Sequence, residues 1–349
     1  MRRIALSGLL VGFLALPASG EVLGTLGPTD YSPAIPTLEA VLGFEWGEEM
    51  TDPGQALTYA RALAAAAPER ARLIEFGRSL EGWPLTLLVV SSEANLAGLE
   101  EIRARLAELG DARRTSATRS AQLSRQLPAV VWFACSVHGD EPSGTDAGLA
   151  LAYHLLAART AEVTEALEKA IVVIDVMQNP DGRARFVTSN RQARGIEPDP
   201  HPMAAERIQP WPGGRFSHAL FDLNRDWIIL SHPESAARVT AMLHWLPQVV
   251  ADLHEMGAEQ GYFFAPPAIP HNPLISKDQV ALWEAFGRAK GAAFDRRGWR
   301  FWTRELFDAF YPGYGESWPL FTGAVGMTFE QGSSRGIRVR LDDGSLLPY

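Results

Sequence analysis

The stretch "PAVVWFACSVHGDE", residues 128–141, decides the fold. Its first ten residues are almost all apolar, and the run stops at His138, with Glu141 three residues later. A short apolar run of this kind predicts a strand that is buried on both faces of a sheet. A strand that ends on a histidine and an acid would deliver both side chains to the sheet edge, where loops from several strands meet.

Apolar runs and helical patterns alternate along most of the chain. We expect two strands joined by a turn at Glu81-Gly82 within 71–92, and further strands at 128–137, 170–178, 247–254 and 324–330. We expect helices at 52–70, 96–109, 141–160, 233–246 and 278–298, with a polar connector before residue 128. This alternation predicts an α/β fold, a three-layer αβα arrangement around a central mixed, mostly parallel sheet. The long stretch 195–214 is rich in Pro and Gly, and we place it at the rim of a site.

The composition is that of a globular enzyme. The 349 residues are 46% hydrophobic and 21% charged, and we expect one catalytic domain over 21–349. The formal net charge of -9 argues against a nucleic-acid partner, which would favour a basic face.

Residues 1–20 have the pattern of a secretory signal peptide. Arg2 and Arg3 precede an apolar run, and small residues follow it. The apolar run is shorter than the roughly 20 residues that a bilayer span requires. We therefore expect a secreted or periplasmic protein with no membrane anchor after removal of the signal. The single cysteine, Cys135, cannot form an internal disulfide.

Three predicted strands end in residues that bind metals or carry protons. The first ends at His138 and Glu141, the second at His254 and the third at Glu330. Two imidazoles and one carboxylate with an open fourth position are typical of a catalytic zinc site, and a further carboxylate can act as the base. Asp252 lies on the same strand face as His254 and could orient that ligand through a hydrogen bond.

The order of seven short motifs resembles that of the zinc carboxypeptidases of the carboxypeptidase A type. The resemblance covers roughly residues 76–330. The motifs, in chain order, are "GRSLEGWPL", "HGDE", "NPDG", "SNRQAR", "DLNRDW", "DLHEMG" and "TFE". The resemblance implies an enzyme that removes the C-terminal residue of peptides or proteins with a free C-terminal carboxylate.

The resemblance also implies the metal and its reaction partners. One Zn²⁺ would be held by His138, Glu141 and His254, and Glu330 would be the catalytic glutamate that takes a proton from the zinc-activated water. Arg194 would polarise the scissile carbonyl.

The remaining motif residues would bind the end of the substrate. Asn224 and Arg225 would grip the terminal carboxylate, which a planar guanidinium can bind at two points. Tyr311 would cap the bound substrate, and Tyr314 is the alternative. The acid Glu316, if it points inward, would favour substrates that end in a basic residue.

The chain departs from the family pattern in one respect. It ends soon after Glu330, at Tyr349, before the helix that normally completes the family fold. We expect either a truncated reading frame or a domain that ends differently.

Three other functions fit parts of the sequence. Amidohydrolases that deacylate N-acyl amino acids share the two histidines and the first glutamate, although the apparent export argues against them. A peptidoglycan-trimming carboxypeptidase of the same fold would suit export. An inactive binding module is the alternative outside the enzymes, and the full set of His138, Glu141, His254 and Glu330 argues against it.

Overall fold

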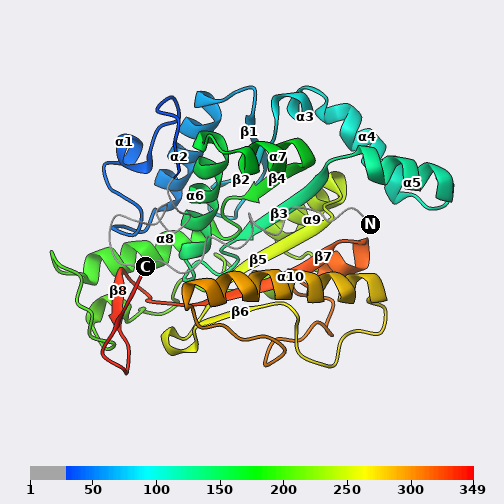
Figure 1. Ribbon diagram of the computed structural model, residues 1–349. Coiled ribbons are helices and arrows are strands. Elements are labelled where there is room, and N and C mark those ends of the chain that lie inside the picture. The colour runs from blue at the N-terminus through cyan, green and yellow to red at the C-terminus, as the bar shows by residue number, and fades with distance from the viewer. Residues whose placement is uncertain (1–28) are drawn as a thin grey trace.

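The computed structural model describes residues 29–349, so the predicted signal peptide lies outside the described residues. A seven-stranded sheet forms the centre (Figure 1), in the spatial order β1-β2-β4-β3-β5-β7-β6. The strands are β1 (Ala71–Arg78), β2 (Pro84–Val90), β3 (Ala129–Cys135), β4 (Ala170–Asp175), β5 (Val249–Met256), β6 (Tyr262–Phe264) and β7 (Val325–Gly332).

The sheet is mixed, as the sequence predicted. The four neighbours β4, β3, β5 and β7 are parallel to one another. β2 runs antiparallel to both β1 and β4, and β6 runs antiparallel to β7. Five of the seven strands therefore point in one direction, and their carboxyl ends meet at one edge.

Helices cover both faces of the sheet and produce two apolar cores. One core joins the sheet to α1 (Leu38–Leu42), α2 (Pro53–Ala66), α6 (Ser143–Ala157), α7 (Ala161–Lys169) and α10 (Lys277–Arg297). The other joins it to α3 (Glu93–Ala97), α4 (Leu99–Gly110) and α9 (Pro233–Trp245). Side chains of β3 point into both cores: Val130 and Trp132 pack in the core with α3, α4 and α9, and Cys135 packs in the core with α6. The predicted three-layer αβα architecture is confirmed.

Two helices lie where the sequence did not predict them. α5 (Ala117–Gln126) occupies the segment expected to be a polar connector, and it buries only Leu123. α8 (Pro180–Ala193) begins within the "NPDG" motif, where Asn179 caps the helix by accepting a hydrogen bond from the backbone of Gly182 at 2.9 Å. Both helices are polar in composition, so the apolar periodicity that reveals a buried helix is weak in them.

Irregular segments and short elements connect the main helices and strands. The predicted helix at 96–109 is divided at Gly98 into α3 and α4. The rim stretch 195–214 is irregular apart from a short 3-10 helix at Ala205–Arg207.

After β7 the chain forms the hairpin of β8 (Arg338–Arg340) and β9 (Leu346–Pro348), and the Tyr349 hydroxyl donates a hydrogen bond to Asp146 on α6. No helix within residues 29–349 is long and apolar enough to cross a membrane.

A buried ion pair fixes α9 to the sheet. Arg238 of α9 donates through Nε to Asp175 at the end of β4, at 2.7 Å, and through Nη2 to the carbonyl of Gln178, at 2.9 Å. Both side chains of the pair are almost completely inaccessible to solvent. Burial raises the pKa of Asp175 and outweighs the lowering effect of Arg238, so the carboxylate depends on this arginine for its charge.

Substitution of Arg238 tests this attachment. We expect Arg238→Met to lower the free energy of unfolding by about 3–5 kcal/mol, because it leaves a buried carboxylate without its partner. Arg288→Met, at an arginine whose side chain is 72% exposed, should change it by less than about 0.5 kcal/mol. Denaturant titration followed by circular dichroism measures both values; equal effects of the two substitutions would contradict the attachment.

Candidate metal centre

A tight turn after β3 brings His138 and Glu141 to the sheet edge. Ser136 leaves the strand with a φ of 53°, an unusual conformation for a residue with a side chain. Its hydroxyl donates a hydrogen bond to the Glu141 carbonyl at 2.8 Å and accepts one from the backbone N–H of Thr145 at 3.2 Å. These bonds hold the turn closed at the start of α6.

His254 and Glu330 reach the same edge from two neighbouring strands. His254 lies near the end of β5, which is parallel to both β3 and β7. Glu330 of β7 is directly opposite His254 in the strand register. Three strand ends that are far apart in sequence therefore converge on one place, as the sequence predicted.

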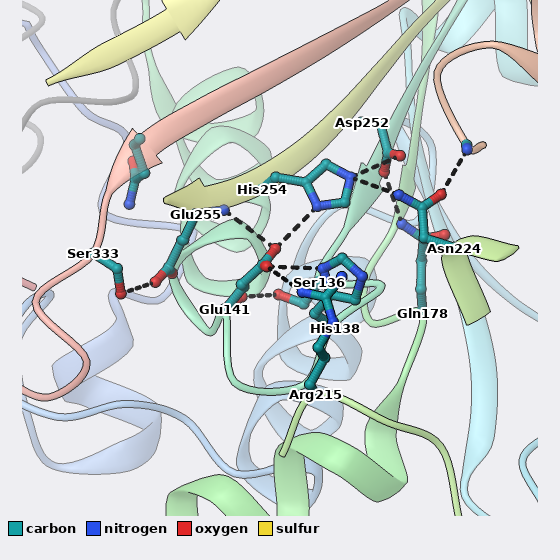
Figure 2. Close-up of polar contacts among 12 residues, drawn as sticks. Ser136, His138, Glu141, Gln178, Arg215, Asn224, Asp252, His254, Glu255 and Ser333 are labelled. Atoms are coloured by element: carbon teal, nitrogen blue, oxygen red, sulfur yellow. Dashed lines mark hydrogen bonds and ion pairs between the residues drawn. The ribbon is translucent and has the colours of Figure 1, made fainter. Parts of the chain in front are cut away.

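The Glu141 carboxylate lies between the two imidazoles (Figure 2). Its Oε1 is 2.8 Å from Nδ1 of His138, and its Oε2 is 3.0 Å from Nδ1 of His254. One potential ligand atom from each of the three residues lies within 4.8 Å of the others, and all three side chains are buried. Oε2 also accepts a hydrogen bond from the backbone N–H of Glu255 at 3.2 Å.

A second carboxylate holds the far side of each imidazole. Nε2 of His138 is 3.1 Å from Oδ1 of Asp222, and Nε2 of His254 is 3.0 Å from Oδ2 of Asp252. Carboxylates in this position fix the ring orientation and leave Nδ1 to face a metal ion. The hydrogen bond expected between Asp252 and His254 is present, whereas the sequence analysis missed the contact of Asp222.

These contacts shift the ionisation of all three candidate ligands. Burial acts to lower the pKa of each imidazole, but the adjacent carboxylates outweigh it and raise the pKa of both His138 and His254. Burial acts to raise the pKa of Glu141, and the two histidines instead hold it far below its usual range. In the absence of metal, these shifts favour a charged Glu141 carboxylate beside protonated imidazoles.

The donor set fits zinc. Two imidazole nitrogens and one carboxylate are a ligand combination of catalytic zinc sites, which keep a fourth position for water or substrate. His138, Glu141 and His254 could supply these three ligands.

Glu330 is buried beside the candidate ligands without joining their group. Burial raises the pKa of its carboxyl to about 8, although His254 acts in the opposite direction. A carboxylate that is easily protonated and lies next to a metal site is suited to proton transfer.

Of the predicted carboxylate-binding residues, Asn224 contacts a candidate metal ligand, and it is in turn in contact with Arg225. Asn224 Nδ2 is 3.4 Å from Nε2 of His254, and its Oδ1 accepts a hydrogen bond from the backbone of Gly315 at 2.7 Å. The guanidinium of Arg225 lies over the ring of Tyr314, 4.5 Å from its centroid. The ring of Tyr311 meets that of Tyr314 edge to face at 5.0 Å. Both candidate tyrosines therefore belong to the surroundings of Arg225.

Arg194 is not seen in contact with the three candidate ligands. It ends α8 and pairs with Glu49, while its Nη1 is buried with no hydrogen-bond partner among residues 29–349. Instead Arg215, which sequence reasoning missed, contacts the group: its Nη1 is 3.5 Å from Oε1 of Glu141. Arg215 follows the irregular stretch 195–214, and no local pattern distinguishes it from a surface arginine.

Comparison with known proteins identifies the family. The profile described as "Zinc carboxypeptidase" matches residues 56–258, more than half of the chain. This chain belongs to the zinc carboxypeptidase family. The matched region contains His138, Glu141 and His254 and ends before Glu330. No curated protein matches the chain significantly.

Solved structures show the same fold at low sequence identity. Carboxypeptidase A from Helicoverpa armigera is 16% identical with a TM-score of 0.55, and the match covers 85% of this chain and 66% of that one. A metallo-carboxypeptidase from Burkholderia cenocepacia is 17% identical with a TM-score of 0.51, covering 80% of this chain and 60% of that one. This chain thus spans about three fifths of the Burkholderia protein.

Zinc binding should stabilise the protein and compete with protons. At a zinc concentration about 100-fold above Kd we expect about 2.7 kcal/mol of stabilisation, which His254→Ala should abolish. Because the adjacent carboxylates raise the pKa of both imidazoles, protons compete with zinc for these ligands, and affinity should rise with pH from 6 to 8, by up to about tenfold per displaced proton for each pH unit.

Thermal unfolding with and without zinc, and chelator competition at several pH values, measure these effects. His218→Ala is the matched control, since this histidine side chain is 59% exposed and pairs with Glu81. An equal response of the two variants, or an affinity independent of pH, would contradict the assignment of the ligands.

Proposed function

We propose that this protein is an exported zinc-dependent metallocarboxypeptidase that hydrolyses the C-terminal peptide bond of peptides or proteins. The observation that carries the proposal is the convergence of His138, Glu141 and His254 on one buried point, with Glu330 opposite His254 on the next strand. The pattern of residues 1–20 supports export.

The reaction assigns a separate task to each group. When bound, zinc would supply an activated water molecule. Glu330 accepts a proton as the water oxygen bonds to the carbonyl carbon and the carbonyl electron pair moves to oxygen. When the C–N bond breaks, Glu330 returns the proton to the departing amine nitrogen.

Asn224 and Arg225 are our candidates for binding the terminal carboxylate, and Tyr311 for closing over the substrate. The hydrogen bond from Gly315 to Asn224 supports this, because it ties the segment of both tyrosines to the metal centre. Arg194 is the candidate from the sequence for polarising the carbonyl. Its guanidinium pairs with Glu49 and would have to leave this carboxylate to contact the substrate.

Glu330→Gln separates catalysis from metal binding. We expect kcat to fall by about 100-fold to 10,000-fold, because the amide cannot accept the proton, while zinc affinity stays close to that of the wild type. Mass spectrometry of a mixed peptide pool would detect loss of single C-terminal residues, and Glu305→Gln at an exposed position is the control. Undiminished cleavage by Glu330→Gln would rule out Glu330 as the base.

The buried carboxyl of Glu316 supports the proposal that the enzyme prefers substrates that end in a basic residue. It lines a narrow cavity together with Phe263, Phe307, Asp308 and Thr328, and no lysine or arginine among residues 29–349 forms an ion pair with it. Burial and then Asp252 raise the pKa of its carboxyl to about 7. The cavity has room for about one water molecule, so a substrate side chain would have to widen it; a buried acid without a cation, beside aromatic rings, would then be complementary to the cationic end of lysine or arginine.

Matched peptides test this preference. We expect kcat/KM to be higher for peptides ending in Lys or Arg than for the same peptides ending in Leu or Glu. Glu316→Gln should reduce the value for Lys by about 30-fold, which corresponds to about 2 kcal/mol for a lost buried charge pair. The value for Leu should change much less, and equal rates for all four peptides would refute the role of Glu316.

A further inference from the structure

A completely buried glutamine lies behind one of the candidate metal ligands. Gln178 belongs to the short segment between β4 and α8, and it has no surface accessible to solvent. Its side-chain nitrogen Nε2 donates a hydrogen bond to Oδ1 of Asp252 at 3.2 Å (Figure 2). The other oxygen of that carboxylate, Oδ2, is 3.0 Å from Nε2 of His254. Gln178 is therefore linked to His254 through Asp252.

The carboxylate of Asp252 depends on these two neighbours. It is completely buried, and within residues 29–349 only Gln178 and His254 form a hydrogen bond or an ion pair with it. The backbone of Gly315 packs directly against it, since a Cβ on Gly315 would lie 2.3 Å from Oδ2. A buried carboxylate requires hydrogen-bond donors. Loss of the donor from Gln178 would leave Oδ1 without a partner.

The backbone around Gln178 is fixed on two sides. Its N–H donates a hydrogen bond to the Cys135 carbonyl at the end of β3, at 2.9 Å, and its carbonyl accepts one from Nη2 of Arg238 on α9, at 2.9 Å. The next residue, Asn179, donates its backbone N–H to the Ser136 carbonyl at 3.2 Å. This support holds the side chain of Gln178 in place against the neighbouring strand β5, so that Nε2 is preorganised as a donor.

The other half of the Gln178 amide has no partner. Its oxygen Oε1 is buried and accepts no hydrogen bond within residues 29–349. A buried polar atom without a partner costs about 1–3 kcal/mol, a cost that an apolar side chain of similar length would avoid. The only polar contact that the side chain makes is the hydrogen bond to Asp252. Packing alone therefore does not explain a glutamine at this position, whereas the orientation of Asp252 does.

We propose that Gln178 is a positioning residue of the metal centre, which fixes the Asp252 carboxylate and thereby orients the imidazole of His254 so that Nδ1 is left to face the metal ion. This role rests on the proposed function, because it concerns the metal that the reaction requires. A carboxylate held at one oxygen only would have more freedom to rotate, and the imidazole bonded to it would share that freedom. Gln178 acts from a buried position, without touching the substrate.

The test compares Gln178→Met with the control Gln279→Met in the full chain. Methionine is unbranched like glutamine and has no N–H donor. Gln279 is also a buried glutamine, but its Nε2 donates to the carbonyls of Leu320 and Ala324, at 2.9 and 2.6 Å, and it contacts none of the candidate ligands. The readouts are zinc affinity from chelator competition, the visible absorption spectrum of the cobalt-substituted protein, and the free energy of unfolding of the metal-free protein.

For Gln178→Met we expect zinc affinity to fall by about 10-fold to 100-fold, the usual effect of losing a partner behind a metal ligand. The cobalt spectrum should shift, because it reports on the arrangement of the ligands around the ion. Gln279→Met should keep the zinc affinity and the cobalt spectrum of the wild type, even where its free energy of unfolding falls as far as that of Gln178→Met.

A double variant with Asp252→Ala separates positioning from packing. If Gln178 acts through Asp252, then Gln178→Met should lower zinc affinity by less than about threefold once the carboxylate has been removed, because the two effects are coupled. Additive losses in the double variant would show that Gln178 only supports the surrounding structure, and would overturn the proposal.

Unchanged zinc affinity and cobalt spectrum in Gln178→Met would also overturn it, as would an equal loss of zinc affinity in Gln279→Met. None of these readouts requires a peptide substrate. A wild-type protein that binds zinc and cleaves no peptide would therefore refute the proposed function, while the same measurements would still decide the role of Gln178.

Discussion

The placement of the Glu141 carboxylate between two imidazoles is the constraint on which the rest of the site depends. It requires that the ends of β3 and β5 be neighbours, which their parallel pairing provides. It also buries a negative charge, which would be very unfavourable without compensation. Asp222 and Asp252 add two more carboxylates behind the histidines, so each imidazole lies between two acids and readily keeps a proton when no metal is present. A divalent cation can take the place of those protons.

Two glutamates of the same site differ in ionisation because their surroundings differ. Glu141 is surrounded by histidines and keeps its charge at any ordinary pH. For Glu330, one strand further, burial outweighs the lowering effect of His254, and the pKa of its carboxyl rises to about 8. The first is suited to remain an anion, whereas the second can gain and lose a proton near neutral pH. The difference arises from packing, since the two side chains are chemically identical.

The sequence predicted those parts of the structure in which local pattern and burial coincide. The strands were recognisable because both of their faces are apolar, and His138, His254 and Glu330 because each directly ends such a run. α5 was missed because it is a polar helix that buries only Leu123, and α8 because several of its buried residues, such as Asp181, Arg183 and Asn190, are polar. Asp222 and Arg215 were missed as site residues for a different reason. They lie in irregular segments whose position depends on tertiary contacts, including backbone packing at Gly139, Gly182 and Gly214, and no short window of sequence contains that information.

The pairing of β5 with β7 has a consequence for the fidelity of folding. His254 faces Glu330 only in one alignment of these two parallel strands. A slip by one residue would set Phe329 or Gln331 opposite His254, and a slip by two would set Thr328 or Gly332 there. Such a chain would retain all three candidate metal ligands, because none of them belongs to β7, and would lack the proposed base, Glu330. Zinc content alone therefore does not report on a correctly assembled molecule; the alignment of one pair of strands distinguishes an active population from a metal-loaded but inert one.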